Sequence, residues 1–167
     1  VVMDETSCMV AIAKFYLEFT CEESCGKCSP CRIGNKRMLE ILDKITKGNG
    51  TMQDLQELRN LADVIKDTAL CGLGQTSPNP VLSTLDNFWD EYVEHVVDKK
   101  CRAGVCKSLM SYEIDPTKCI GCGACKRVCP QDAIEGEKKM AHHIDNLKCI
   151  KCGACIEKCK FGAISIK

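Results

Sequence analysis

The residues of this chain best suited to chemistry are its cysteines, which number 16 among 167 residues. Cys25, Cys28 and Cys31 follow one another at C-x2-C-x2-C spacing, and Cys71 is the nearest thiol without an assignment. Three close thiolates and one distant thiolate suit the four iron corners of a [4Fe–4S] cluster, whereas zinc usually takes two separated pairs. We therefore expect these four cysteines to hold a first iron–sulfur cluster, with zinc on the same residues as the alternative. Cys21 is interpreted as a packing thiol.

The last fifty residues carry two further cysteine groups, each with C-x2-C-x2-C-x3-C spacing. The first group is Cys119, Cys122, Cys125 and Cys129, and the second is Cys149, Cys152, Cys155 and Cys159. Gly-Cys-Gly-Ala-Cys in the first group matches Lys-Cys-Gly-Ala-Cys in the second, which indicates an internal duplication. The second group has Lys160 where the first has Pro130, and Lys160 is interpreted as a solvated surface residue.

Short strands are expected to flank these repeats. Residues 111–114 should pair with 164–166, and residues 133–135 with 142–144. His142 and His143 lie between the repeats, and we expect them in a solvated hairpin because each cluster already has four cysteines.

The first hundred residues, which must position the first cysteine set, are predicted to form helices. Apolar residues at spacings of three and four predict an amphipathic helix over residues 8–20. A second helix should start at Ser29 and stop at the glycine-rich residues 47–50. Thr51, with Asp54 as its capping-box partner, should start a third helix.

A fourth helix is predicted from Pro78 onward, with apolar residues along one side at Leu82, Leu85, Trp89, Tyr92 and Val96. Four helices with short connections favour an up-down-up-down bundle. The predicted fold class is therefore a mainly α four-helix domain followed by an α+β domain. In that topology, the end of the first helix, the start of the second and the end of the third share one pole. The cysteine triplet and Cys71 would meet there.

The opposite pole would bring the start of the first helix beside the end of the fourth. Cys8 lies at the first of these places, and His95, Cys101 and Cys106 lie at or after the second. Three cysteines and one histidine form a closed structural zinc set, and a zinc ion here would fix the joint between two domains. The alternative is a buried core thiol at Cys8, a solvated His95, and free thiols or a reversible disulfide at the other two.

Composition limits the classes of function. The 23 basic and 23 acidic residues cancel, and aromatic residues make up only 5%, so nothing favours binding to nucleic acid or to an acidic membrane surface. The sequence shows no signal peptide and no apolar run long enough to span a bilayer, so we expect no membrane insertion. Reduced thiolates in a cytoplasmic compartment are expected. The opening Val-Val-Met-Asp lacks an initiator context, and a further domain is expected upstream.

The first hundred residues resemble a known family. Glu-Ser-Cys-Gly-x-Cys-x-Pro-Cys-Arg, followed by the Cys-x-Leu-Gly that begins at Cys71, is similar to the C-terminal region of the flavin-bearing NADH-oxidising subunit of respiratory complex I. The same region occurs in NAD(P)-linked and electron-bifurcating hydrogenases and in NAD-dependent formate dehydrogenases. The resemblance implies that the first cluster takes electrons from a nearby FMN, which NAD(H) reduces. That family binds FMN and NAD in a preceding domain, so we expect no FMN ligand, NAD ligand or catalytic residue in this chain.

Residues 111–167 resemble the bacterial two-cluster ferredoxins. In such duplicated motifs the fourth cysteine of each group ligates the other cluster. The resemblance therefore implies two crossed ligand sets, namely Cys119, Cys122, Cys125 and Cys159 for one cluster and Cys129, Cys149, Cys152 and Cys155 for the other.

These patterns together predict a helical iron–sulfur domain at 1–98, a linker or zinc hinge at 99–110 and a ferredoxin-like domain at 111–167. The expected function is one-electron transfer through three [4Fe–4S] clusters within an electron-bifurcating hydrogenase or a related dehydrogenase complex. The expected partners are other components of that complex and soluble ferredoxin. Two alternatives remain: a zinc-rich binding module without redox activity, and a self-contained enzyme with an open iron site.

Overall fold

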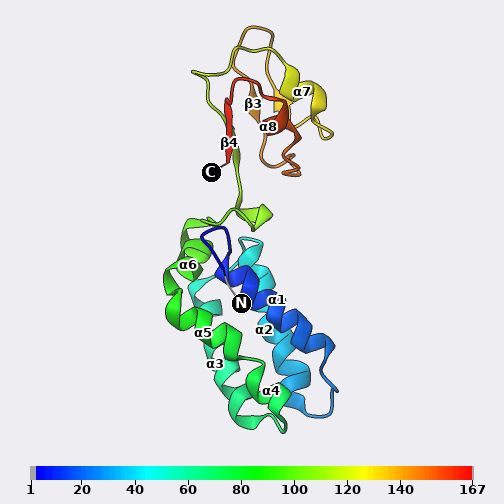
Figure 1. Ribbon diagram of the computed structural model, residues 1–167, viewed down its shortest axis with the longest axis vertical. Helices are drawn as coiled ribbons and strands as arrows, with labels where there is room; N and C mark the ends of the chain where they lie inside the picture. The colour runs from blue at the N-terminus through cyan, green and yellow to red at the C-terminus, as the bar shows by residue number, and fades with distance from the viewer. Residues whose placement is uncertain (1–2, 167) are drawn as a thin grey trace. The chain divides into compact units, whose positions relative to one another are not determined.

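The chain forms two compact units, which we describe separately. The computed structural model describes residues 3–166, and the boundary between the units follows Leu109. The first unit is helical, and the second combines short strands with short helices (Figure 1). No helix within residues 3–166 is both long and apolar enough to cross a membrane.

The helical unit contains segments that follow the predicted order, with additional short turns. They are α1 (Met9–Glu22), η1 (Pro30–Gly34), α2 (Asn35–Thr46), α3 (Met52–Thr68), α4 (Gly72–Thr76), α5 (Asn79–Asn87), α6 (Trp89–Val93), η2 (Glu94–Asp98) and η3 (Lys107–Leu109). The segments η1 and η2 are π-helical turns, which are rare and often mark functional sites. They carry Cys31 and His95, respectively.

The predicted start of the third helix is confirmed. The Thr51 side chain accepts a hydrogen bond from the Asp54 N–H, and the Thr51 N–H donates to an Asp54 carboxylate oxygen at 2.6 Å. Lys44 of the preceding helix adds an ion pair to the same carboxylate at 2.8 Å. This capping box therefore fixes both the start of α3 and its position beside α2.

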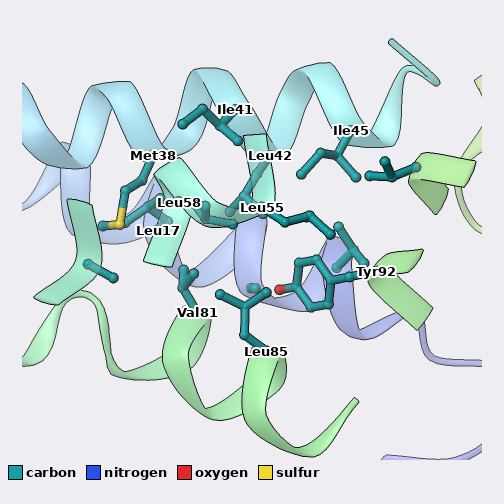
Figure 2. Close-up of a cluster of buried hydrophobic side chains, with 14 of the residues drawn as sticks. Leu17, Met38, Ile41, Leu42, Ile45, Leu55, Leu58, Val81, Leu85 and Tyr92 are labelled. Atoms are coloured by element: carbon teal, nitrogen blue, oxygen red, sulfur yellow. The ribbon is translucent and has the colours of Figure 1, made fainter. Parts of the chain in front are cut away.

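The core of this unit lies between α1, α2, α3, α5 and α6 (Figure 2). Helix α1 contacts α2 and α5, and α3 contacts the same two helices, so these four enclose the core. Burial of each large apolar side chain stabilises such a core by roughly 1.5–3 kcal/mol. The buried side chains labelled in Figure 2 are Leu17, Met38, Ile41, Leu42, Ile45, Leu55, Leu58, Val81, Leu85 and Tyr92.

The prediction of one continuous fourth helix was wrong. Phe88 leaves helical geometry with φ −133° and ψ 38°, and this break separates α5 from α6. The break changes the helical phase, so Trp89 is 41% exposed, whereas Leu85 and Tyr92 are buried as predicted. The Tyr92 hydroxyl lies 2.8 Å from the Thr84 hydroxyl, which gives this buried phenol a hydrogen-bond partner.

Both strand pairs expected in the second unit are present. Its elements are β1 (Tyr112–Ile114), α7 (Ala124–Val128), β2 (Ile134–Glu135), β3 (His143–Ile144), α8 (Ala154–Lys158) and β4 (Ile164–Ile166). Strands β1 and β4 pair antiparallel, as do β2 and β3. The two helices contact each other, and alternate strand residues pack beneath them. Each strand–helix combination thus places one cysteine group against the common core of the unit.

The expectation of a solvated hairpin holds for only one of the two histidines between the repeats. His143 is exposed, whereas His142 is only 5% exposed. The register explains the difference: Ile144 is buried opposite Ile134, and side chains alternate across the strand, so His142 points to the same face as Ile144.

Candidate metal centres

The structure brings Cys8, His95, Cys101 and Cys106 together in the helical unit. Their four ligand atoms all lie within 4.8 Å of one another, and all four residues are buried. The His95 Nε2 atom lies 3.3 Å from the Cys8 Sγ atom and 3.5 Å from the Cys106 Sγ atom. The alternative interpretation of His95 as a solvated surface residue is wrong, because its exposed fraction is 0%.

Local contacts hold these four side chains in place. His95 Nδ1 lies 2.7 Å from the Glu91 carbonyl oxygen, so an Nδ1–H donating there leaves Nε2 free to face the thiols. The Glu91 carboxylate in turn accepts a hydrogen bond from the Met9 N–H, which ties α6 to the start of α1. Gly104 adopts φ 64° between the last two cysteines, and its N–H donates to the Cys101 carbonyl. A histidine ligand is commonly oriented by such a carbonyl contact.

The ionisation equilibria of Cys8, Cys106 and His95 are linked, and a bound zinc ion would displace protons from the last two. A hydrogen bond with the Cys106 thiol is the largest cause that lowers the pKa of Cys8 to about 4, against the opposing effect of burial. The same contact raises the pKa of Cys106. Burial lowers the pKa of His95, but its hydrogen bond and charge attraction to Cys8, together with its hydrogen bond to the Glu91 backbone, outweigh burial and raise that pKa to about 9. Three thiols and one imidazole in a buried cluster are the donor set of a closed zinc site.

Three residues of the first cysteine set, Cys28, Cys31 and Cys71, lie around η1 and the loop between α3 and α4. Backbone N–H groups of Leu70 and Cys31 hydrogen-bond to the Cys28 thiol and lower its pKa. Cys28 therefore lies against the loop that carries Cys71. A Cβ atom added to Gly74 would lie 3.3 Å from the Cys31 Cβ and 2.7 Å from the Ala69 Cβ. The chain can approach Cys31 this closely because position 74 is glycine.

Exposure differs among the four residues of this first set. Cys31 is buried, Cys28 is half-buried, and Cys25 and Cys71 are exposed. Helix α4 begins directly after Cys71, and its Gly74 lies against Cys31. Polar groups that contact the sulfur of the buried Cys31 support the fit of this set to a metal cluster.

Two of these polar groups were not predicted from the sequence. Asn35 Nδ2 donates to the Cys31 Sγ atom at 3.4 Å, and the Ser24 hydroxyl lies 3.2 Å from the same sulfur. Asn35 is fully buried, and its amide oxygen accepts a hydrogen bond from the Ser77 hydroxyl at 2.9 Å. The available signal was the spacing, because a residue four positions after Cys31 on a helix lies on the same face.

The second unit contains two cavities, and each brings together four cysteines from both repeats. One is lined by Cys119, Cys122, Cys125 and Cys159, and the other by Cys129, Cys149, Cys152 and Cys155. These are the groupings that the resemblance to two-cluster ferredoxins implies. Burial raises the pKa of Cys125 and of Cys155, so a bound metal would be needed to hold these thiols as thiolates.

The two repeats also share their hydrogen bonds to sulfur. The Ala133 N–H donates to the Cys129 Sγ atom at 3.3 Å, and the Ala163 N–H donates to the Cys159 Sγ atom at 3.4 Å. N–H donors of this kind stabilise a thiolate that binds metal. The exposed Lys160 replaces Pro130 within this turn without changing the contact to sulfur.

Backbone conformations repeat as well. Gly121 and Gly123 have φ values of 70° and 69°, and their counterparts Lys151 and Gly153 have 57° and 82°. A Cβ atom on Gly121 would lie 2.5 Å from the Met140 backbone, so only glycine fits there, whereas Lys151 carries a side chain at the matching place. The cysteine loops of both cavities thus have closely similar shapes that suit the same cofactor.

Known proteins match both units. A family model described as the NADH-ubiquinone oxidoreductase-F iron–sulfur binding region matches residues 11–95, and one described as a 4Fe–4S dicluster domain matches residues 111–160. The chain is 65% identical over 139 residues to the NADP-reducing hydrogenase subunit HndC of Solidesulfovibrio fructosivorans, and this alignment covers 83% of this chain and 28% of that protein. It is 40% identical over 105 residues to a component of the NADH-quinone oxidoreductase of Streptomyces coelicolor, and this alignment covers 63% of this chain and 23% of the relative.

A solved structure agrees with these matches. The NAD+-reducing [NiFe]-hydrogenase in its H2-reduced state superimposes with a TM-score of 0.55 and 30% identity, which covers 57% of this chain and 16% of that one. The chain thus spans less than a third of the length of these relatives. The family model on the helical unit covers half of the residues, and the cysteines of that unit lie within or beside it. The chain therefore belongs to the family of the NADH-ubiquinone oxidoreductase-F iron–sulfur binding region, with a 4Fe–4S dicluster domain after it.

Proposed function

We propose that this chain is the electron-transferring part of an NAD(P)- and FMN-linked hydrogenase complex and that it holds three [4Fe–4S] clusters. The observation that carries the proposal is the pair of cavities that each gather three cysteines from one repeat and one from the other. An iron–sulfur cluster supplies reversible one-electron chemistry when bound. The chain supplies the thiolates, the N–H donors to sulfur and the apolar surroundings that exclude water.

The ligand sets of this proposal follow the cysteine groups. Cys25, Cys28, Cys31 and Cys71 hold the first cluster in a four-helix domain at 1–98. The crossed sets of the second unit hold the other two clusters in a ferredoxin-like domain at 111–167. The contacts that support the first set are the Leu70 N–H to the Cys28 thiol and the close approach of Gly74 to Cys31.

The similarity to a hydrogenase subunit supports the choice of complex. The 139-residue alignment with the NADP-reducing hydrogenase subunit is longer than the helical unit, so it extends into the dicluster domain. We place the first cluster next to an FMN in an upstream domain. The dicluster domain is then a branch that exchanges electrons with soluble ferredoxin or another component of the complex, as electron bifurcation requires.

Cys8, His95, Cys101 and Cys106 hold a structural Zn²⁺ in this proposal. Their burial, their 4.8 Å grouping and the carbonyl contact that orients His95 support zinc. Zinc is redox-inert, so the ion would not carry electrons. It would instead link segment 99–110 to the start of α1, where Cys8 lies, and to η2, which contains His95. Cys101, Cys106 and Leu109 belong to the core of the helical unit, which gives the segment a fixed attachment there.

Metal and acid-labile sulfide analysis of the anaerobically purified protein tests the whole proposal. We expect about twelve iron, about twelve sulfide and about one zinc per chain. Twelve iron without zinc would leave the electron-transfer function and remove the zinc site. Zinc without sulfide would overturn the electron-transfer function in favour of a zinc-rich binding module.

A further inference from the structure

His142 is a buried side chain with no role in the ligand sets described above. It precedes β3, which is labelled in Figure 1, and it lines the cavity that holds the first crossed cysteine set. The other polar residues that line this cavity are the four cysteines themselves. An imidazole thus lies in the wall of one proposed cluster site.

The His142 ring occupies space that is open only because residue 136 is a glycine. A Cβ atom on Gly136 would lie 2.8 Å from the His142 Cγ and 2.9 Å from its Cδ2, so a larger residue would displace the ring. Gly136 also adopts φ 153°, which side chains disfavour. On the other side, a Cβ atom on Gly123 would lie 3.9 Å from the His142 Nε2. Gly123 follows Cys122 directly, so the ring is packed against the cysteine loop.

The Nδ1 atom of the ring lacks a hydrogen-bond partner within the described residues. Among residues 3–166, His142 Nδ1 is the one fully buried side-chain nitrogen or oxygen without a hydrogen-bond partner. Leaving such an atom unpaired costs free energy, and unpaired groups in native proteins usually meet an ion, a water or a ligand. The sulfides and thiolates of an iron–sulfur cluster are hydrogen-bond acceptors, and an imidazole N–H is a suitable donor.

The second cavity lacks an equivalent group among the described residues that line it. Its polar residue other than cysteine is Tyr112, and the Tyr112 hydroxyl already donates to the Lys151 carbonyl at 3.4 Å. Tyr112 therefore has a protein partner, whereas His142 Nδ1 does not. The duplication has produced two similar cysteine loops with different polar neighbours.

We propose that the His142 imidazole donates an N–H hydrogen bond to the cluster held by Cys119, Cys122, Cys125 and Cys159, and that this bond makes that cluster easier to reduce. The inference rests on the proposed function, since it requires a cluster in that cavity. A hydrogen bond to sulfur stabilises the reduced cluster, which carries one more electron and more negative charge. The electron goes to the cluster alone, and His142 keeps its proton and is neither oxidised nor reduced.

EPR-monitored redox titration of the purified holoprotein with low-potential mediators tests this. We expect His142→Leu to retain its iron and sulfide and to show one cluster whose reduction equilibrium is about tenfold less favourable, which is about 59 mV for a one-electron couple. The other two clusters should keep their potentials. His142→Gln keeps an N–H donor and should lie closer to the wild type. His143→Leu, the exposed neighbour, is the matched control and should match the wild type.

The outcomes separate this inference from the proposed function. If the wild type holds three clusters and His142→Leu leaves all three potentials unchanged, the hydrogen bond is refuted and electron transfer stands. If the wild type contains no iron or sulfide, the proposed function itself fails. If His142→Leu loses its iron, its potentials cannot be compared with those of the wild type. Pulsed EPR of the reduced wild-type protein labelled with 15N-histidine then tests whether a histidine nitrogen lies beside a cluster. We expect a weak 15N coupling that persists in labelled His143→Leu, and its absence would overturn the inference.

Discussion

Cys8 and His95 are 87 residues apart in the sequence, yet the Cys8 Sγ atom lies 3.3 Å from the His95 Nε2 atom. Cys8 also caps α1, because its sulfur accepts a hydrogen bond from the Ala11 N–H. One side chain thus stabilises the start of the first helix and contacts η2, the π-helical turn that follows α6. This contact therefore links the first helix of the helical unit to one of its last helical turns.

The zinc proposal predicts that His95→Ala lowers the zinc content from about one ion per chain to near zero. Removal of one ligand leaves three buried thiols that no longer form a closed site, so the thermal unfolding midpoint should also fall. Iron and sulfide contents should stay the same, because no iron ligand is changed. Elemental analysis and circular dichroism measure both effects.

Cys21→Ser is the matched control for that experiment. Cys21 is a half-buried thiol of the same unit, and burial raises its pKa. It lies outside the zinc set, so the variant should keep its zinc. Full zinc occupancy in His95→Ala would contradict the assignment of His95 as a ligand.

The crossed ligand sets predict how much iron each double cysteine variant should lose. Cys119→Ser with Cys159→Ser should remove one cluster, or about four iron, because both residues line the same cavity. Cys119→Ser with Cys129→Ser should remove two clusters, or about eight iron, although both residues belong to the same repeat. Iron analysis and EPR spin quantitation measure the difference.

The opposite result would support uncrossed sets. In that arrangement the pair within one repeat would remove one cluster and the pair across repeats would remove two. Lys160→Pro restores the residue of the first repeat beside Cys159 and should retain all the iron, because the Ala163 N–H already reaches the Cys159 sulfur.

The first cluster is predicted to depend on the loop between α3 and α4. Cys71→Ser should lower the iron content by about four per chain and leave the EPR signals of the dicluster domain unchanged. Asn35→Leu should retain the iron but make this cluster harder to reduce, because it removes the amide that donates to the Cys31 sulfur. If Cys71→Ser keeps all its iron, another residue must supply the fourth ligand.

Gly136→Ala tests the packing around His142. Its new Cβ atom would lie 2.8 Å from the His142 ring, so the ring must move and lose its position in the cavity wall. We expect a lower potential for one cluster, as in His142→Leu, together with a small loss of stability. Gly162→Ala is the matched control, because a Cβ there meets no atom within 4 Å although its φ is also positive, and the first repeat carries Asp132 at the matching position with φ 47°. Equal potentials in both variants would argue against a role for the ring.

The capping box of α3 predicts a loss of stability without a change in the clusters. Asp54→Asn removes the ion pair with Lys44 and weakens the cap at Thr51, which should cost about 1 kcal/mol. Burial opposes ionisation, but the hydrogen bonds from Lys44 and Thr51 together outweigh it and lower the pKa of Asp54 below its usual value. The stabilisation is therefore fully present above the unfolded pKa and is lost only as the pH falls through the lowered folded value.

The stability difference between wild type and Asp54→Asn should thus stay constant from about pH 7.5 to about pH 5. Thermal unfolding followed by circular dichroism measures it. Asp63→Asn changes an exposed carboxylate on the same helix and should leave the midpoint within the experimental error. A difference that disappears already near pH 6 would show that another group is responsible.

The groupings of cysteines in the two cavities and around His95, and most of the helices and strands, could be predicted from the amino-acid sequence and its family resemblance. Spacing of three and four residues predicted the long helices, and the duplicated motif predicted both strand pairs. These features are local or repeated, so the chain displays them directly. The proximity of Cys8 and His95 was also predictable, because short connections between helices limit the topology.

The features that depend on exact packing became visible only in the folded chain. The break at Phe88 follows from a single backbone conformation, and it turned Trp89 toward solvent. The burial of His142 depends on the register of β2 and β3 and on the close approach of Gly136, neither of which has a periodic signal. Periodicity shows which residues share a face of one element, whereas contacts between elements depend on how their surfaces fit together. For that reason the cysteine groupings could be predicted from the sequence, and the side chains around them could not.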